Sequence, residues 1–430
     1  MNRHFVRAPV IEISRLANGF TVATERMPEI ATATLGVWVG AGSRNEEAAE
    51  HGLSHLIEHM AFKGTARRSA RAIAEDIENV GGEINAATSV EFTSYTARVL
   101  GEDVEVALDV IGDILTASVF EAAELAREKS VILQEYAAVE DTPDDLIYDA
   151  FMETAFPGQP IGRPILGTPD TVASFDGDMI RRFMAREYTP GRMVLAAAGD
   201  VEHAQILEAA ERSFGSLPAV ETPRTAPGRY LGGERRIPRK LEQASLVLGL
   251  PGLSFKDPGY YATHLFAHIL GGGLTSRLWH EVRERRGLAY SIDAFHWPFT
   301  DCGLFGIGAA TAASDVADLV AVTLDCTRRA TLDAEPPELA RARAQMKVAL
   351  LTALETPGGR IERTARQLLA WNRIVGGDEI VERVDAVTLD QVREAGRRLV
   401  AGPLTLAAIG PIGGLPAART IAEGLRLSAA

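Results

Sequence analysis

The chain has 430 residues, 46% hydrophobic and 24% charged, which is the composition of a folded globular protein with two or more domains. Its formal net charge of −14 disfavours binding to nucleic acid and favours an electropositive partner or substrate. The two cysteines, Cys302 and Cys326, cannot build a disulfide framework, so a reducing compartment fits best.

The beginning of the chain predicts neither export nor insertion into a membrane. Residues 1–7 carry charge, but the apolar stretch of a signal peptide does not follow them. No run along the chain approaches the ~18 apolar residues that would span a bilayer. A strand is expected from Ile11 onward. We therefore expect a cytoplasmic protein without membrane partners, and the Ala- and Arg-rich composition suggests a bacterial source.

The most informative segment is His55-Leu56-Ile57-Glu58-His59, which has the pattern H-x-x-E-H. On a helix, His55 and His59 lie one turn apart and can bind one metal ion, while Glu58 points the same way. This arrangement is typical of zinc peptidases, in which the glutamate is the general base. The alternative interpretation is a surface helix that carries two histidines.

Helices and strands follow one another in the first half without strict βαβ alternation. Ser69 is expected to cap a helix that ends at Gly81. Residues 84–99 are rich in Thr, Val, Phe and Tyr and predict extended structure, whereas residues 103–115 and 121–139 predict helices. This mixture indicates an α+β fold.

The helix predicted over residues 121–139 carries two candidate acids. Glu135 lies 76 residues after His59 among apolar residues, where a lone carboxylate would be costly to bury, so it is the best candidate for a third zinc ligand. Glu128 lies two turns earlier on the same face. It suits a supporting carboxylate that orients a ligand histidine or shares a proton, and the alternative is a solvated helix charge.

The chain carries an internal duplication. Residues 124–127 recur as residues 338–341, 214 positions later, and other segments recur at similar offsets. Prolines and a glycine interrupt the periodicity over residues 217–228. We therefore expect two homologous domains, 1–222 and 223–430, each a mostly antiparallel sheet packed with helices.

The second copy is expected to have the same fold but lacks the acidic residues of the candidate zinc site. It retains two histidines, His264 and His268, which are interpreted as relics of the duplication. Alanines replace the three acids, so that Glu58, Glu128 and Glu135 correspond to Ala267, Ala342 and Ala349. Only the first domain is therefore expected to bind zinc.

The motif, followed by Glu135 at a spacing of 76 residues, resembles the pitrilysin-type inverted zinc peptidases of the insulinase family. The resemblance is to the bacterial branch that is similar to the beta subunit of mitochondrial processing peptidase. Further matching segments are 61–65, Asn85-Ala86 and 162–167. The resemblance implies that His55, His59 and Glu135 bind one zinc ion per chain, with Glu58 as base and Glu128 as supporting acid.

The same resemblance implies a zinc-dependent endopeptidase that cuts extended or unfolded peptides. Zinc-bound water would attack the scissile carbonyl after Glu58 takes its proton. The substrate would add a strand at the sheet edge near Asn85 to Ser89, where Asn85 and Ala86 are candidate substrate-binding residues. Ala87 departs from the family pattern, in which an aromatic residue is common, and this departure affects the substrate groove.

Two further pairs are candidates for substrate binding. Arg283 and Tyr290, seven residues apart, are similar to a family pair that contacts the substrate, and the alternatives are a surface salt bridge and a core aromatic residue. Asp145 and Asp149 lie where processing peptidases hold acids that recognise an arginine, which would favour basic, presequence-like substrates. The alternative is a solvated face, because the whole segment 140–149 is acidic.

The resemblance also implies an assembly. Family clamshells contain four such domains, and two here would form half of a clamshell, so a homodimer is expected in which Arg283 and Tyr290 of one protomer serve the zinc of the other. An active subunit that needs a different partner is an alternative. A non-catalytic scaffold, such as a core subunit of a respiratory complex, is another, and Glu58 argues against it.

Overall fold

The computed structural model describes residues 11–427, which form two compact units, each built from three segments of the chain. In the described chain these segments are 11–136, 164–226 and 350–378 for unit 1, and 137–163, 227–349 and 379–427 for unit 2. The expectation that no export signal is present rests on residues 1–7, which lie outside the described residues.

Unit 1 contains a six-stranded sheet. Its strands are β1 (Ile11–Arg15), β2 (Thr21–Arg26), β3 (Thr32–Val39), β4 (Glu83–Thr88), β5 (Thr93–Leu100) and β6 (Met193–Gly199). They are ordered β1-β2-β6-β3-β5-β4. The pair β2 and β6 is parallel, and the other neighbouring strands are antiparallel.

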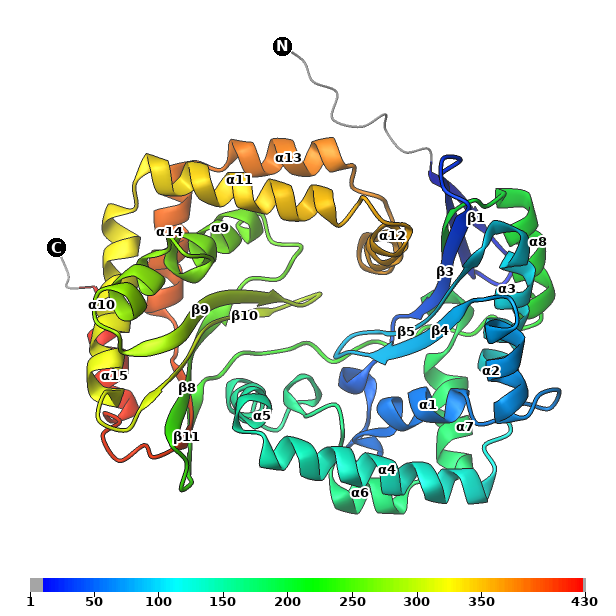
Figure 1. Ribbon diagram of the computed structural model, residues 1–430, viewed down its shortest axis with the longest axis horizontal. Coiled ribbons are helices and arrows are strands. Elements are labelled where there is room, and N and C mark those ends of the chain that lie inside the picture. The colour runs from blue at the N-terminus through cyan, green and yellow to red at the C-terminus, as the bar shows by residue number, and fades with distance from the viewer. Residues whose placement is uncertain (1–10, 428–430) are drawn as a thin grey trace, which may run out of the picture. The chain divides into compact units, whose positions relative to one another are not determined.

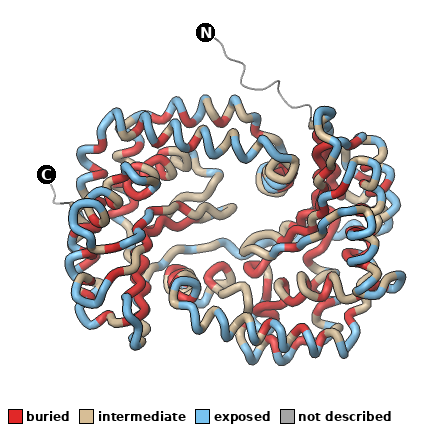
Figure 2. Tube along the Cα trace, viewed as in Figure 1, coloured by how far each residue is buried: buried red, intermediate tan, exposed pale blue. Residues whose placement is uncertain are grey.

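Helices cover both faces of this sheet. Those of unit 1 are α1 (Leu53–Ala61), α2 (Ala70–Glu78), α3 (Val104–Thr116), α4 (Ala122–Asp141), α6 (Pro169–Ser174), α7 (Gly177–Glu187), α8 (His203–Phe214) and α12 (Pro357–Trp371). Leu195 and Ala197 of β6 belong to the core shared with α3 and α8, whereas Val194 and Ala196 pack with α12. Because both faces are covered, β6 is buried along its whole length. The neighbouring strand β3, labelled in Figure 1, is likewise largely buried and is drawn mostly in red in Figure 2.

The elements predicted for the first half are present. The Oγ of Ser69 accepts a hydrogen bond from Ala72 N at 3.2 Å and caps α2, and Gly81 follows the helix with a φ of +67°. The extended segment 84–99 forms the antiparallel pair β4 and β5. The helices predicted over 103–115 and 121–139 are α3 and α4.

Unit 2 contains a five-stranded sheet of closely related topology. Its strands are β7 (Gly233–Pro238), β8 (Gln243–Gly252), β9 (Ala289–Pro298), β10 (Gly303–Ala312) and β11 (Thr405–Gly410), and its helices are α5 (Pro143–Ala155), α9 (Tyr260–Gly271), α10 (Val316–Asp333), α11 (Pro336–Thr352), α13 (Gly377–Ala386), α14 (Leu389–Ala401) and α15 (Ala418–Leu425). The order β7-β11-β8-β10-β9 again places one parallel pair, β7 and β11, beside antiparallel strands. The predicted α+β fold with two related, mostly antiparallel sheets is confirmed.

The two halves of the chain exchange a helix. The helix α5 belongs to the first half by sequence but packs on β7, β8 and β11 of unit 2, whereas α12 belongs to the second half and packs on β2, β3 and β6 of unit 1 (Figure 1). The 214-residue offset relates Pro143 to Pro357, the first residues of the two helices. The division into 1–222 and 223–430 stays a prediction about the duplication, and the compact units differ from it by these exchanged segments.

None of the helices within residues 11–427 combines the length and the apolar character that crossing a bilayer requires.

Candidate metal centre

The helix α1 carries the H-x-x-E-H motif. Its buried face packs in the core of unit 1, and its first residues are held by hydrogen bonds. Leu56, Ile57 and Met60 are buried in the core of unit 1. At the start of the helix, the carboxylate of Glu46 accepts hydrogen bonds from Gly52 N at 2.8 Å and from Ser54 N at 2.7 Å. A carboxylate at a helix N-terminus satisfies amides that have no partner within the helix and interacts favourably with the helix dipole.

The residue before α1 must be a glycine. Gly52 has a φ of +96°, and a Cβ there would lie 2.7 Å from Gly167 Cα. The hydroxyl of Thr171 donates to the carbonyl oxygen of His51 at 2.7 Å and ties the same turn to α6. The orientation of α1, and with it of the histidines, is therefore set by tight backbone packing.

The helix α4 presents the two predicted acids toward α1. Leu125, Glu128 and Ile132 are its buried residues, spaced at helical intervals, and Glu135 lies three residues further along the same face. The spacing of seven residues between Glu128 and Glu135 therefore places both carboxylates on the face that packs into unit 1.

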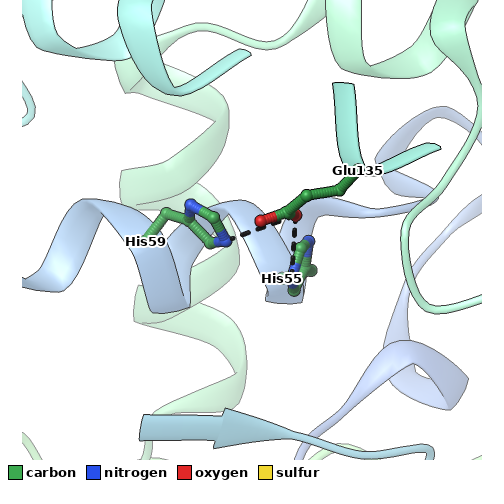
Figure 3. Close-up of side chains that lie close together, drawn as sticks. All are labelled: His55, His59 and Glu135. Atoms are coloured by element: carbon green, nitrogen blue, oxygen red, sulfur yellow. Dashed lines mark ion pairs between the residues drawn. The ribbon is translucent and has the colours of Figure 1, made fainter. Parts of the chain in front are cut away.

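The structure brings His55, His59 and Glu135 together. The Oε2 of Glu135 lies 3.7 Å from His55 Nε2 and 3.7 Å from His59 Nε2 (Figure 3). These distances exceed those of hydrogen bonds. Within the described residues, this is the group of His, Cys, Asp and Glu side chains whose ligand atoms converge closely enough to hold one metal ion.

The donor set fits zinc. Two imidazole nitrogens and one carboxylate oxygen form a ligand set of catalytic zinc sites, and donors that each lie about 2.0–2.2 Å from one zinc ion are roughly 3.3–3.5 Å apart. Glu135 Oε2 is buried and has no hydrogen-bond partner in the described chain, although a buried carboxylate oxygen is costly to leave without one. A cation between the three side chains would remove that cost.

The environment keeps His55 suited to metal binding. Burial, together with the charge of His59, lowers the pKa of His55 to about 4. At neutral pH its imidazole is therefore uncharged, which is the form that binds metals.

Glu128 connects His59 with Lys63. Its Oε2 lies 3.0 Å from His59 Nδ1, and its Oε1 lies 2.7 Å from Lys63 Nζ. Burial alone would raise the pKa of Glu128, but the hydrogen bonds from Lys63 and His59 outweigh burial and lower it. Lys63 has no predicted role, although it lies one turn beyond His59 and within segment 61–65, which is one of the segments that resemble the family.

Glu58 lies beside a buried pair of tyrosines. The hydroxyl groups of Tyr95 and Tyr188 are 2.9 Å apart. Burial is the main cause that raises the pKa of both phenols, that of Tyr188 to about 12, and the charge of Glu58 adds to the increase. Both hydroxyls therefore stay protonated near the candidate base. Neither tyrosine belongs to a motif, and the inward position of Tyr95 in its strand is the only sequence signal.

The remaining residue pair predicted in unit 1 lies at a sheet edge. Asn85 and Ala86 belong to β4, which pairs with β5 on one side and ends the sheet. Asn85 is exposed, Ala86 is buried, and Ala87 is exposed again, as the alternation of a strand requires. The edge is therefore available for pairing with another extended chain.

Arg283 and Tyr290 lie close together in unit 2. The guanidinium of Arg283 lies 4.1 Å from the ring centre of Trp279 and 4.6 Å from that of Tyr290. Tyr290 is 79% exposed, so the alternative of a core aromatic residue is wrong. Trp279 is a third member of this group that no predicted motif contains, and its position four residues before Arg283 in a helical segment is the only sign of it.

The two predicted aspartates lie on α5 of unit 2 and differ in environment. Asp145 is exposed, whereas Asp149 is half-buried. Burial and the charges of Glu153, Asp145 and Glu140 raise the pKa of Asp149 to about 6. Asp149 is therefore not an ordinary solvated charge.

The two histidines of the second copy, His264 and His268, lie on α9. Burial and the charges of His268 and His296 lower the pKa of His264 to about 4. The carboxylate positions of the first copy are occupied by Ala342 and by Ala349, and the convergence of ligand atoms found around His55 is not repeated in the described part of unit 2. Within the described residues, the second copy therefore offers no group of converging ligand atoms like that of the first.

Comparison with known proteins gives matches over most of the chain. A family model described as insulinase (peptidase family M16) matches residues 21–169, and one described as the peptidase M16 inactive domain matches residues 174–346. The chain is 38% identical to an uncharacterized zinc protease of Streptomyces coelicolor over 92% of this chain and 89% of that protein. It is 36% identical to the mitochondrial-processing peptidase subunit beta of Lentinula edodes, over 95% and 91%. A chain of complex III2 from Candida albicans has the same fold, with a TM-score of 0.85 and 24% identity over 96% and 99% of the two chains.

Proposed function

Because this chain belongs to the insulinase family of peptidases, family M16, we propose that it is an active zinc-dependent endopeptidase that cuts extended or unfolded peptides. The convergence of His55, His59 and Glu135 on one point carries the proposal. The relatives named zinc proteases support zinc as the metal.

His55, His59 and Glu135 would hold one zinc ion per chain. Bound zinc supplies a Lewis acid and lowers the pKa of bound water to about 7. Glu58 accepts the proton of the attacking water and then delivers it to the leaving amine nitrogen. The Nδ1–H of His59 donates a hydrogen bond to the Glu128 carboxylate, which leaves the lone pair on Nε2 as the metal-binding one.

Substrate binding is proposed to rest on backbone contacts and charge. An extended peptide would pair with the free edge of β4 near Asn85 and Ala86, which requires that the substrate is unfolded at the cut. Arg283, with its fixed planar donors, and the exposed Tyr290 would bind substrate carbonyl oxygens.

A preference for substrates with arginine is proposed from the acids of α5. Asp145 and Asp149 are one helical turn apart and lie in an acidic environment, since Glu140 and Glu153 act on the same carboxyl group. An arginine bound there would offset this concentration of negative charge. A peptide in which citrulline, which is neutral, replaces the arginine should then bind more weakly than the arginine peptide.

We further propose a homodimer and a cytoplasmic location. The name of the Lentinula edodes relative as a subunit favours a second candidate, an active subunit that works with a different partner chain. Sedimentation of the chain expressed alone, combined with its peptidase activity, separates the two: an active dimer supports the homodimer, and an inactive chain that gains activity with a second protein supports the other candidate.

The test of the peptidase proposal compares the wild type with Glu58→Gln. This variant keeps the three proposed ligands and loses the base, so it should bind zinc at the wild-type stoichiometry without cutting an unstructured, arginine-containing peptide. Glu78→Gln, an exposed change on α2, is the matched control and should do both. A wild type that binds zinc but never cuts would favour a scaffold or an active subunit that lacks its partner, and one that binds no zinc would refute the ligand assignment.

A further inference from the structure

We propose that Lys63 is a positioning residue of the metal centre, which acts through Glu128 on His59 and thereby increases the affinity for zinc. The inference rests on the proposed function in that it takes His59 as a zinc ligand. The ammonium group of Lys63 holds one oxygen of the Glu128 carboxylate so that the other oxygen stays directed at His59.

The geometry divides the two oxygens of Glu128 between two donors. Oε1 lies 2.7 Å from Lys63 Nζ and Oε2 lies 3.0 Å from His59 Nδ1. The side chain of Glu128 is 8% exposed, so solvent offers little alternative to either contact. Among the ion pairs of the described residues, the carboxylate of Glu128 pairs with His59 and with Lys63. Lys63 is therefore its partner besides the histidine.

The direction of hydrogen bonding follows from the chemistry of the lysine. An ammonium group has three protons and no acceptor, so the oxygen that faces Lys63 must accept. When the other oxygen accepts from His59 Nδ1–H, the lone pair of the imidazole is on Nε2, the nitrogen that lies 3.7 Å from Glu135 Oε2. The contact with Lys63 therefore supports the one arrangement in which His59 can bind the metal.

The backbone after α1 places Lys63 where it can act. The helix ends at Ala61, and Lys63 N donates to Met60 O at 3.1 Å, which turns the chain immediately after the motif. Gly64 follows with a φ of +121°. Without the lysine, the carboxylate of Glu128 could turn about its last side-chain torsion, which has a broad energy minimum, and the bond that orients His59 would loosen.

An ordinary surface ion pair would contribute little, and this pair differs from one. The Lys63 side chain is 31% exposed, but its partner is nearly buried and is itself bonded to a proposed ligand. Partners of this kind change metal affinity by roughly 10- to 100-fold when they are removed, whereas an exposed pair leaves it unchanged.

The experiment measures the zinc affinity of the full chain, first freed of metal, by competition with a chelator. Lys63→Met should bind zinc about tenfold more weakly than the wild type. Lys63→Arg should restore most of the affinity, since arginine also donates to a carboxylate. Lys129→Met is the matched control, because Lys129 neighbours Glu128 in sequence but donates to Ala173 O at 3.0 Å, and it should bind zinc as the wild type does.

A double variant tests whether Lys63 acts through Glu128. Lys63→Met combined with Glu128→Gln should bind zinc no more weakly than Glu128→Gln alone. Additive losses, an unchanged affinity in Lys63→Met, or a Lys63→Arg variant as weak as Lys63→Met would each overturn the proposal. If Lys63→Met does not fold, Lys63→Gln replaces it with the same expectation.

The outcomes distinguish this inference from the proposed function. A wild type that binds zinc but cuts no peptide would refute a peptidase that is active without a partner chain, while the zinc affinities of the Lys63 variants still decide the positioning role. A wild type that binds no zinc would overturn both.

Discussion

Replacing Asp149 by asparagine should stabilise the protein at neutral pH and leave its stability at acid pH almost unchanged. In the folded chain the pKa of Asp149 is raised from 3.8 to about 6, first by burial and then by Glu153, Asp145 and Glu140. Because the folded pKa lies above the unfolded value, folding favours the protonated form. The associated stability is complete below about pH 4 and is lost as the pH rises through about 6.

The magnitude follows from the shift. A difference of about two pKa units corresponds to roughly 3 kcal/mol of unfolding free energy lost between about pH 4 and about pH 7. Screening at the exposed edge of Asp149 lowers this to roughly 2–3 kcal/mol. Asparagine has nearly the same shape and no charge, so Asp149→Asn should recover most of this energy at neutral pH.

Urea unfolding of wild type and variant at several pH values between about 4 and 8 measures the effect. The difference between the two midpoints should be small at about pH 4, should grow as the pH rises from about 4 to about 6, and should stay large above that range. Asp141→Asn, an exposed aspartate on the same acidic segment, is the control and should show no such pH-dependent gain. Equal stability of Asp149→Asn and wild type at about pH 8 would refute the reasoning.

Three further changes test other parts of the structure. Glu46→Gln weakens the cap of α1 and should cost about 1–2 kcal/mol in urea unfolding, and an unchanged midpoint would contradict the capping role. Ile361→Ala removes a buried contact of α12 with the sheet of unit 1 and should cost about 2–4 kcal/mol, whereas a surface position would show almost none. Trp279→Leu removes one ring from Arg283 and should raise the KM for a peptide by about three- to tenfold; equal KM values, or a parallel loss of zinc binding, would contradict a role confined to substrate contact.

Local patterns predicted the arrangement of the metal centre because each depends on helical periodicity. His55 and His59 share a face at a spacing of four residues, and Glu128 and Glu135 share another at a spacing of seven, whichever way the rest of the chain folds. Helical periodicity did not predict that α1 and α4 pack against each other. That expectation came from the resemblance to known peptidases.

Contacts made after a helix end or within an acidic run were not predictable in this way. Lys63 follows the end of α1, where no periodic spacing relates it to Glu128. Asp149 belongs to a run of acidic residues, a pattern that is typical of a solvated surface. In the structure Asp149 is nevertheless half-buried, because α5 packs against a sheet. The exchange of helices was also hidden, since Thr142-Pro143 and Thr356-Pro357 start both helices alike and carry no information about which sheet each one covers.

The exchanged helices determine the order in which the protein can be completed on the ribosome. Chains fold from the N-terminus as they are synthesised. One face of the sheet in unit 1, with Trp38 and Val194, stays uncovered until Ile361 and Leu368 have been made. The helix α5, in turn, emerges long before β11, one of the strands it packs on. Neither unit can therefore close early, and the nascent chain must stay soluble with an open sheet face until almost all of its length has been translated.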